Sequence, residues 1–284
     1  MRRFHDVRGR IAGLASSADV KTLMACVRGA MKVAVWDLET GAFRRWHPYA
    51  DEPVSSLAFS PDGKWLAVGS EVGMVLPYYY PELNYDGEYH PGAPVSGVAF
   101  GWTEGRSDCR LAMAGDCITV ALMSGGEIDK PPSGDATSAA AVAFSANGRW
   151  LAAVNGNTFA VHLWDAWADR HERTGELDSE PRSVCFSADG QVLAVAAASR
   201  VWLTDVPSLR TWGACAHGGR VAQVAGHPTR NLVASAGADG TVRFWSADAA
   251  AGERVYDWEM GGVTAVAFAP DGLTCAVGGV KGQV

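Results

Sequence analysis

The sequence predicts an all-β protein built from repeated sheets, and three observations support that class. A segment like VSSLAFSPDGKWLAVGS (54–70) recurs along the chain, short apolar runs alternate with turns such as SPDG (60–63), and 11 of the 284 residues are tryptophan. Short apolar runs bounded by Pro, Asp and Gly are typical of β-strands rather than helices. We therefore expect strands along the whole chain.

Seven copies of this unit follow one another at a nearly constant period. They begin near residues 11, 54, 95, 139, 181, 221 and 263, so successive starts are 40 to 44 residues apart. Each copy has three apolar runs and then a more polar one, such as FRRWH (43–47) or RVYDW (254–258). A period of about 40–45 residues with four strands per unit is typical of β-propeller blades. We expect one domain, residues 1–284, forming a seven-bladed β-propeller of four-stranded antiparallel blades.

The two ends of the chain are complementary. The last copy stops at GGVKGQV (278–284), where its third strand should begin, and RRFH (2–5) resembles the outer-strand sequence RRWH (44–47). We expect residues 2–5 to close the last blade as its outer strand, which would hide a sheet edge. That blade lacks most of its third strand, so either the chain is truncated at its C-terminus or the ring is weakly closed.

Composition and charge exclude several classes. A formal net charge of −7 disfavours nucleic-acid binding, which depends on Lys and Arg. No apolar stretch suits a membrane span or a signal peptide, so we expect a cytoplasmic protein. The six cysteines form no CxxC pair, and we expect buried free thiols, with a disulfide or a metal site as lesser alternatives. No cofactor is expected.

The third strands carry a family resemblance. Trp36-Asp37 and Trp164-Asp165 are literal WD dipeptides and Trp245-Ser246 is a near match, so the chain resembles a WD-repeat protein, of the type found in bacteria with GC-rich genomes. The resemblance implies a ring-shaped scaffold for protein or peptide partners, either a monomeric ring or a module of a larger assembly. Three copies depart from the pattern, with Tyr78, Ala121 and Thr204 at the tryptophan position.

One blade holds a group that on paper imitates a hydrolytic triad: His217, Ser235 and Asp239. The family resemblance favours a structural role, because in similar repeats these side chains form a hydrogen-bonded chain that ends on the tryptophan, here Trp245. His217 follows Ala216 rather than the usual glycine.

Two surfaces are candidates for partner binding. The tyrosine-rich segment 77–91 offers Tyr79, Tyr80 and Tyr85, unless they only fill a blade interface. The face that the family uses most often is predicted to carry Arg10, Glu71, Asp116, Asn157, Arg182 and Arg220. Its three arginines suit an acidic peptide or a phosphate group, with ordinary surface charge as the alternative.

The expected function is that of a non-catalytic scaffold. The innermost strands, such as VSSLAF and AAAVAF, are small and apolar, and no Gly-x-Ser-x-Gly, GxxxxGK or His-Glu-x-x-His motif is present. The alternative is a small-ligand sensor or a propeller enzyme with its site at the mouth of the central channel.

Overall fold

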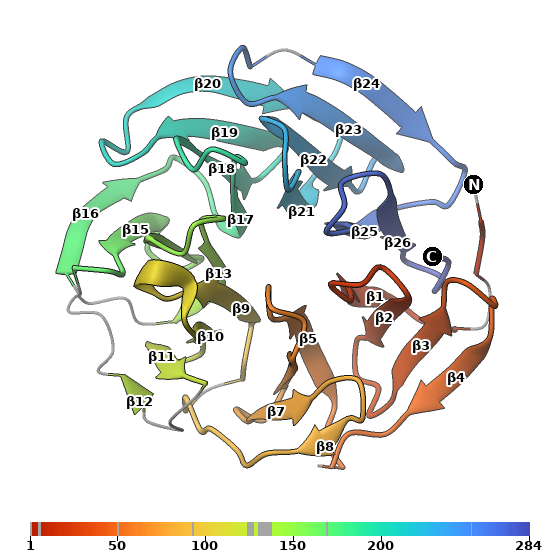
Figure 1. The fold of residues 1–284 in the computed structure, drawn as a ribbon. Coiled ribbons are helices and arrows are strands. Elements are labelled where there is room, and N and C mark those ends of the chain that lie inside the picture. Colours follow the sequence, from red (N-terminus) through yellow and green to blue (C-terminus); the bar gives the residue numbers. More distant parts are fainter. Residues whose placement is uncertain are drawn as a thin grey trace.

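Antiparallel sheets surround a central axis and form a ring (Figure 1). The computed structural model describes residues 2–4, 7–49, 51–92, 94–123, 128–129, 138–168, 170–250 and 252–284. Within these ranges six sheets have four strands and one has two. The expected propeller of four-stranded antiparallel blades is therefore present, but the expected seven complete blades are not confirmed. Six blades are complete, and the seventh position holds a two-stranded sheet.

We number the blades in chain order. Blades 1 to 3 consist of β1 (Ile11–Ser16), β2 (Thr22–Val27), β3 (Val33–Asp37) and β4 (Phe43–Trp46); β5 (Val54–Phe59), β6 (Trp65–Ser70), β7 (Val75–Tyr79) and β8 (Asn84–Tyr85); and β9 (Gly97–Trp102), β10 (Cys109–Ala114), β11 (Ile118–Leu122) and β12 (Ile128–Asp129). A short 3₁₀ helix, Glu104–Arg106, links β9 and β10.

Blades 4 to 6 and the seventh sheet follow the same order. They consist of β13 (Ala139–Phe144), β14 (Trp150–Asn155), β15 (Ala160–Asp165) and β16 (Arg170–Glu176); β17 (Pro181–Phe186), β18 (Val192–Ala197), β19 (Arg200–Asp205) and β20 (Thr211–Ala216); β21 (Val221–Gly226), β22 (Leu232–Gly237), β23 (Thr241–Ser246) and β24 (Gly252–Asp257); and β25 (Val263–Phe268) and β26 (Cys275–Gly279). Among the described residues, no helix is long and apolar enough to cross a membrane.

A β-bulge recurs at the start of the innermost strand. The register shifts after the first residue of β1, β5, β13, β17, β21 and β25, for example between Val54 and Ser56. A bulge increases the local twist and redirects one side chain, so these six strands share the same local geometry at their first residues. In blade 3 the strand β9 begins at Gly97, two residues after the expected start, and its pairing with β10 has no shift.

The turn between the first two strands of a blade is held by side chains. In blade 2 the Ser60 hydroxyl accepts the N–H of Trp65 at 2.9 Å, and the Asp62 carboxylate accepts the N–H of Lys64 at 3.1 Å. Ser17, Ser145 and Ser187 make the equivalent bond in blades 1, 4 and 5. These bonds satisfy turn donors that would otherwise lack a partner.

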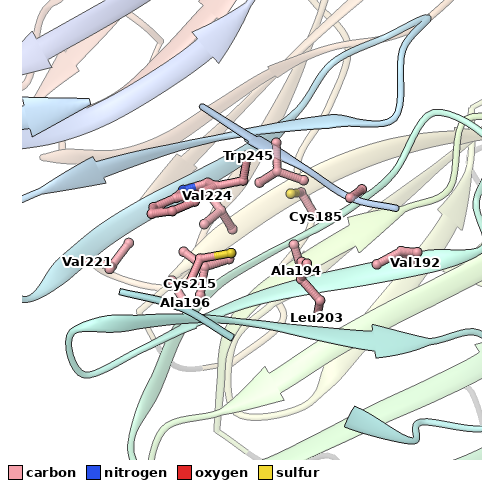
Figure 2. Close-up of a cluster of buried hydrophobic side chains, with 12 residues drawn as sticks. Cys185, Val192, Ala194, Ala196, Leu203, Cys215, Val221, Val224 and Trp245 are labelled. Atoms are coloured by element: carbon pink, nitrogen blue, oxygen red, sulfur yellow. The ribbon is translucent and has the colours of Figure 1, made fainter. Parts of the chain in front are cut away.

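Large third-strand side chains fill the space between blades. Figure 2 shows Trp245, from β23, over Val224 and beside Cys185 of the preceding blade. Trp245 is 7% exposed and Leu203, in the same cluster, is fully buried. Each blade is therefore held on its neighbour by apolar packing, and the tryptophan of a third strand faces the blade before it.

The ends of the chain meet where the ring closes. The backbone of Phe4 pairs with that of Val284 through two hydrogen bonds of 2.8 and 3.2 Å, and the Phe4 ring lies 5.2 Å from that of Trp36. The hydroxyl of Thr264 in β25 donates to the carbonyl of Ile11 in β1 at 2.8 Å. The N-terminal segment thus lies outside the seventh sheet and against blade 1. Of the expected closing residues 2–5, His5 lies outside the described ranges.

Candidate functional site

A hollow of about 510 Å³ lies beside blade 1, and we call it the basic hollow. Its wall comes from three parts of the chain: the segment before β1, the turn between β2 and β3, and the outer strand β4. Apolar side chains form much of its lining, and Arg8, Lys32 and Arg45 are its charged members. The lining residues are Val7, Arg8, Val27, Gly29, Ala30, Met31, Lys32, Ala34 and Arg45, none of which is acidic.

Backbone hydrogen bonds hold the turn above this hollow in place. The N–H of Arg28 donates to the carbonyl of Arg10 at 2.9 Å, and the carbonyl of Ala30 accepts the N–H of Val54 in the next blade. Arg8, Arg10, Arg28 and Lys32 are all exposed. The backbone of this turn is therefore held by hydrogen bonds, and the four exposed cations make the local surface potential more positive.

Exposed apolar side chains lie in this turn and in the corresponding turns of the two neighbouring sheets. Met31 is 46% exposed, Val72 in the corresponding turn of blade 2 is 50% exposed, and Val280 in that of the seventh sheet is 39% exposed. These turns follow one another around the ring, since blade 1 lies between the seventh sheet and blade 2 (Figure 1). The surface of these turns therefore combines positive charge with exposed apolar side chains.

The structure separates the three predicted arginines. Arg182 and Arg220, from blades 5 and 6, both reach the carboxylate of Glu180, at 2.8 and 3.7 Å. Arg10 belongs to blade 1, beyond the seventh sheet (Figure 1). Glu180 neutralises part of the charge of Arg182 and Arg220, whereas Arg10 lies in the same part of blade 1 as the exposed cations Arg8, Arg28 and Lys32.

The other three predicted residues of this face occupy the turns between second and third strands. The Glu71 carboxylate accepts the N–H of Gly29 at 3.2 Å, and this hydrogen bond joins blade 2 to blade 1. Asp116 is exposed and its carbonyl accepts the N–H of Ser138. Asn157 follows Asn155, whose side chain accepts the Asn157 N–H at 2.8 Å. These contacts shape the turns and leave their side chains on the surface.

The predicted tyrosines divide between packing and surface. Tyr79 is 44% exposed and lies 4.2 Å from the Trp65 ring. Tyr80 is half-buried, bonded to the Thr22 hydroxyl of blade 1 at 2.8 Å, and so belongs to the interface between blades. Tyr85 stacks on Tyr49 at 4.6 Å, and Tyr49 is 74% exposed. Tyr79 and the Tyr49–Tyr85 pair thus remain available to a partner, whereas Tyr80 does not.

The triad-like residues form one continuous hydrogen-bonded chain in blade 6. His217 Nδ1 lies 3.3 Å from the Asp239 carboxylate, His217 Nε2 lies 2.6 Å from Ser235 Oγ, and the indole N–H of Trp245 donates to Ser235 Oγ at 2.7 Å. When Nδ1 carries the imidazole proton and donates it to the Asp239 carboxylate, the unprotonated Nε2 accepts the hydroxyl hydrogen bond of Ser235. Ser235 is fully buried, so its oxygen is closed to any substrate.

The protonation states of His217 and Asp239 follow from the surroundings of these two side chains. Burial lowers the pKa of His217, outweighing the opposite effect of the Asp239 carboxylate. Burial alone would raise the pKa of Asp239, but hydrogen bonds from Thr241, Gly218 and His217 lower it to about 2. At neutral pH this hydrogen-bonded group therefore contains a neutral His217 imidazole and an ionised Asp239 carboxylate.

Sequence reasoning missed most of the basic hollow. Arg8, Arg28 and Lys32 carry no motif, and only the fold brings the segment before β1 against the turn after β2. The one available signal was the density of cations in the first 45 residues of an acidic chain. Tyr49 was also missed, because it lies outside the tyrosine-rich segment. Among the described residues, no group of three or more His, Cys, Asp or Glu side chains is placed to hold a metal ion.

Comparison with known proteins agrees with this geometry in part. Residues 44–71 and 208–246 match the family model described as WD domain, G-beta repeat. The second segment contains His217, Ser235, Asp239 and Trp245. No curated protein matches the chain. The two matching segments and the ring of four-stranded sheets together support a WD-repeat propeller.

Proposed function

We propose that this WD-repeat propeller is a non-catalytic scaffold that binds partner proteins or peptides, and that the basic hollow is its main contact surface. The observation that carries the proposal is the local excess of cations around exposed apolar side chains, on a chain whose net charge is −7. Such a surface attracts an acidic segment and then buries its apolar side chains.

The partner segment is defined by the chemistry of the hollow. Arg8 and Lys32 favour carboxylates, while Met31 and Ala30 favour an apolar side chain between them. Methionine adapts its shape readily, which suits several related segments rather than one ligand. The proposed ligand is thus an acidic peptide segment with at least one large apolar residue.

The buried chain in blade 6 supports the non-catalytic part of the proposal. A serine nucleophile must reach its substrate, whereas Ser235 is covered and its oxygen is already bonded to Trp245 and His217. We propose that these four residues hold the second and third strands of the blade together.

Charge reversal tests this function. The double variant Arg8→Glu, Lys32→Glu changes two cations that line the hollow. It is compared with Lys64→Glu and Arg230→Glu, whose charges lie in turns between first and second strands, on the opposite face of the ring. Proteins captured from the source organism by the unaltered chain are identified, purified and titrated at several salt concentrations. We expect the double variant to bind roughly tenfold more weakly, and the two controls to bind as the unaltered chain does.

Two results would contradict the proposal. Equal affinity of the double variant and the controls would exclude the basic hollow as the contact surface. Failure to capture any protein would make a small-ligand site at the mouth of the channel the next function to test.

A further inference from the structure

A second hollow, of about 550 Å³, lies between blades 5 and 6, and we call it the acidic hollow. Its wall includes turns between first and second strands and between third and fourth strands, so it lies on the face of the ring opposite the basic hollow. Its charged members are Asp205 and Asp248, and none of its lining residues is basic. Gln191 and Trp212 also belong to its wall. The charge of this hollow favours a cationic ligand.

The backbone at this point has the same geometry in blades 4 and 5. In both blades, the residue that follows the third strand donates its N–H to the carbonyl of the residue before the second strand. By this criterion Gln191 in blade 5 corresponds to Arg149 in blade 4. In the same way Asp205, the last residue of β19, corresponds to Asp165, the last residue of β15.

In blade 4 an arginine of the chain itself occupies the carboxylate. Arg149 Nε and one of its terminal nitrogens lie 3.0 and 2.9 Å from the same oxygen of Asp165. The guanidinium also lies over an aromatic ring, 4.9 Å from the centre of Trp150. The other Asp165 oxygen accepts the N–H groups of Trp167 and Ala168, both at 3.1 Å. Blade 4 therefore shows how this position holds a guanidinium.

In blade 5 the corresponding carboxylate lacks these partners. Pro207 stands where blade 4 has Trp167, and proline has no N–H to donate. The neutral Gln191 stands where blade 4 has Arg149. Within the described part of the chain, no cation pairs with the Asp205 carboxylate, which is exposed. Its full charge and both of its oxygens are therefore available to a ligand.

An aromatic ring and a second carboxylate lie in the same hollow. Trp212, from β20, is 38% exposed, so its indole surface is accessible. Asp248, from blade 6, is exposed and accepts one hydrogen bond from the Asn231 side chain at 3.1 Å. A guanidinium pairs with carboxylates through two parallel bonds and stacks on indole rings, which the compact ammonium of lysine does less well. The acidic hollow thus offers the same two kinds of contact that Arg149 makes in blade 4.

We propose that the acidic hollow binds an arginine side chain of a partner protein. The guanidinium pairs with Asp205 and lies on Trp212, and Asp248 adds attraction. Exposed Pro207, at the rim beside Asp205, contacts apolar residues that flank the arginine. This site differs from the basic hollow in its residues, its face of the ring and its charge, so it goes beyond the proposed function.

The first test is titration of the full chain with the peptide acetyl-Gly-Leu-Arg-Leu-Gly-amide. Binding is followed by the indole N–H resonance of Trp212, which is assigned by its absence from Trp212→Phe. Two matched peptides carry citrulline, which is neutral and has the shape of arginine, or lysine in place of the arginine. We expect saturable binding of the arginine peptide, roughly tenfold weaker binding of the citrulline peptide, and intermediate binding of the lysine peptide.

Two variants test the residues of the hollow. Asp205→Asn keeps the shape of the side chain and removes its charge, and we expect roughly tenfold weaker binding of the arginine peptide. Asp116→Asn, on the opposite face, should bind it as the unaltered chain does. Gln191→Arg gives blade 5 the arginine of blade 4, which should pair with Asp205 and prevent peptide binding. Gln191→Met changes the same position without a charge and should retain binding.

Four results would overturn the proposal. Equal binding of the peptide to Asp205→Asn and to the unaltered chain would exclude the carboxylate. Equal binding of the arginine and citrulline peptides would exclude recognition of the charge, and equal binding of the lysine peptide would exclude selection of arginine. Free L-arginine bound as tightly as the peptide would overturn the assignment to a partner protein. If Gln191→Arg fails to fold, Asp205→Asn decides.

Discussion

At the residue scale, one buried imidazole connects three elements of blade 6. His217 precedes β21, Ser235 lies in β22, and Trp245 lies in β23, so the chain of hydrogen bonds ties the strands across the sheet. The approach is close: a Cβ atom at Gly237 would lie 2.3 Å from both His217 Nδ1 and an Asp239 oxygen. Only glycine fits there.

Replacing this imidazole changes both stability and its pH dependence. His217→Ala leaves Ser235 and Trp245 with an incomplete set of buried bonds and should lower the free energy of unfolding at pH 7.5 by about 1–3 kcal/mol. In the unaltered chain the unfolded state takes up a proton on His217 near pH 6.5, before the folded state does, because the folded pKa is lowered. The stabilisation is thus present above pH 6.5 and is lost as the pH falls.

Urea titrations between pH 5 and 7.5 check this expectation. His217→Ala should show a shallower loss of stability below pH 6.5, while His90→Ala, which removes an exposed histidine, should follow the unaltered chain. Parallel curves for His217→Ala and the unaltered chain would contradict a lowered pKa. Asp239 has a folded-state pKa of about 2, below the ordinary aspartate value of 3.8. Its contribution to stability is therefore lost only at more acidic pH, as the pH falls from 3.8 towards 2.

At the element scale, the turn between the first two strands uses the same serine bonds in blades 1, 2, 4 and 5, and the seventh sheet has the turn without the serine. In the seventh sheet, Asp271 still accepts the N–H of Leu273 at 2.9 Å, and the backbone bonds of Ala269 to Thr274 and Gly272 match those of Ser60 to Trp65 and Gly63. Ala269 lacks the hydroxyl that Ser17, Ser60, Ser145 and Ser187 use in their turns. The backbone of this turn therefore has the conformation in which the other blades place a serine.

Ala269→Ser should stabilise the chain by about 1 kcal/mol, because the new hydroxyl can donate to Asp271 and accept the N–H of Thr274. The reciprocal change, Ser187→Ala in blade 5, should cost a similar amount, since it removes the same pair of bonds. Chemical denaturation of both variants measures the two differences. A loss of stability in Ala269→Ser would show that the turn of the seventh sheet differs from the others.

At the scale of the whole molecule, the ring depends on a small closing contact. Phe4 is the only described residue that pairs with Val284 in the backbone, and its ring covers Trp36. The rest of the closure comes from β25 against β1, including the Thr264 bond to Ile11.

Phe4→Ala should lower the free energy of unfolding by about 2 kcal/mol through lost packing on Trp36, and should increase proteolytic cleavage near the ends of the chain. Arg3→Ala, an exposed neighbour, serves as the control. Thermal unfolding and limited proteolysis measure the effects. Unchanged proteolysis of Phe4→Ala would show that β25 and β1 close the ring without the N-terminal segment.

The sequence by itself determined the repeated four-stranded sheets, because the turns and the alternation of apolar residues are local signals repeated about every 42 residues. It also indicated the members of the His217 chain and the contact between the two ends, since each repeat can be aligned with its neighbours.

The tertiary structure alone decided what those repeats make together. The basic hollow joins residues from a leading segment, a turn and an outer strand, and the Glu180 bridge between Arg182 and Arg220 depends on side-chain reach across two blades. At the end of β7, Tyr80 faces blade 1 and packs there, whereas Tyr79 remains exposed, and this difference depends on the placement of the neighbouring blade.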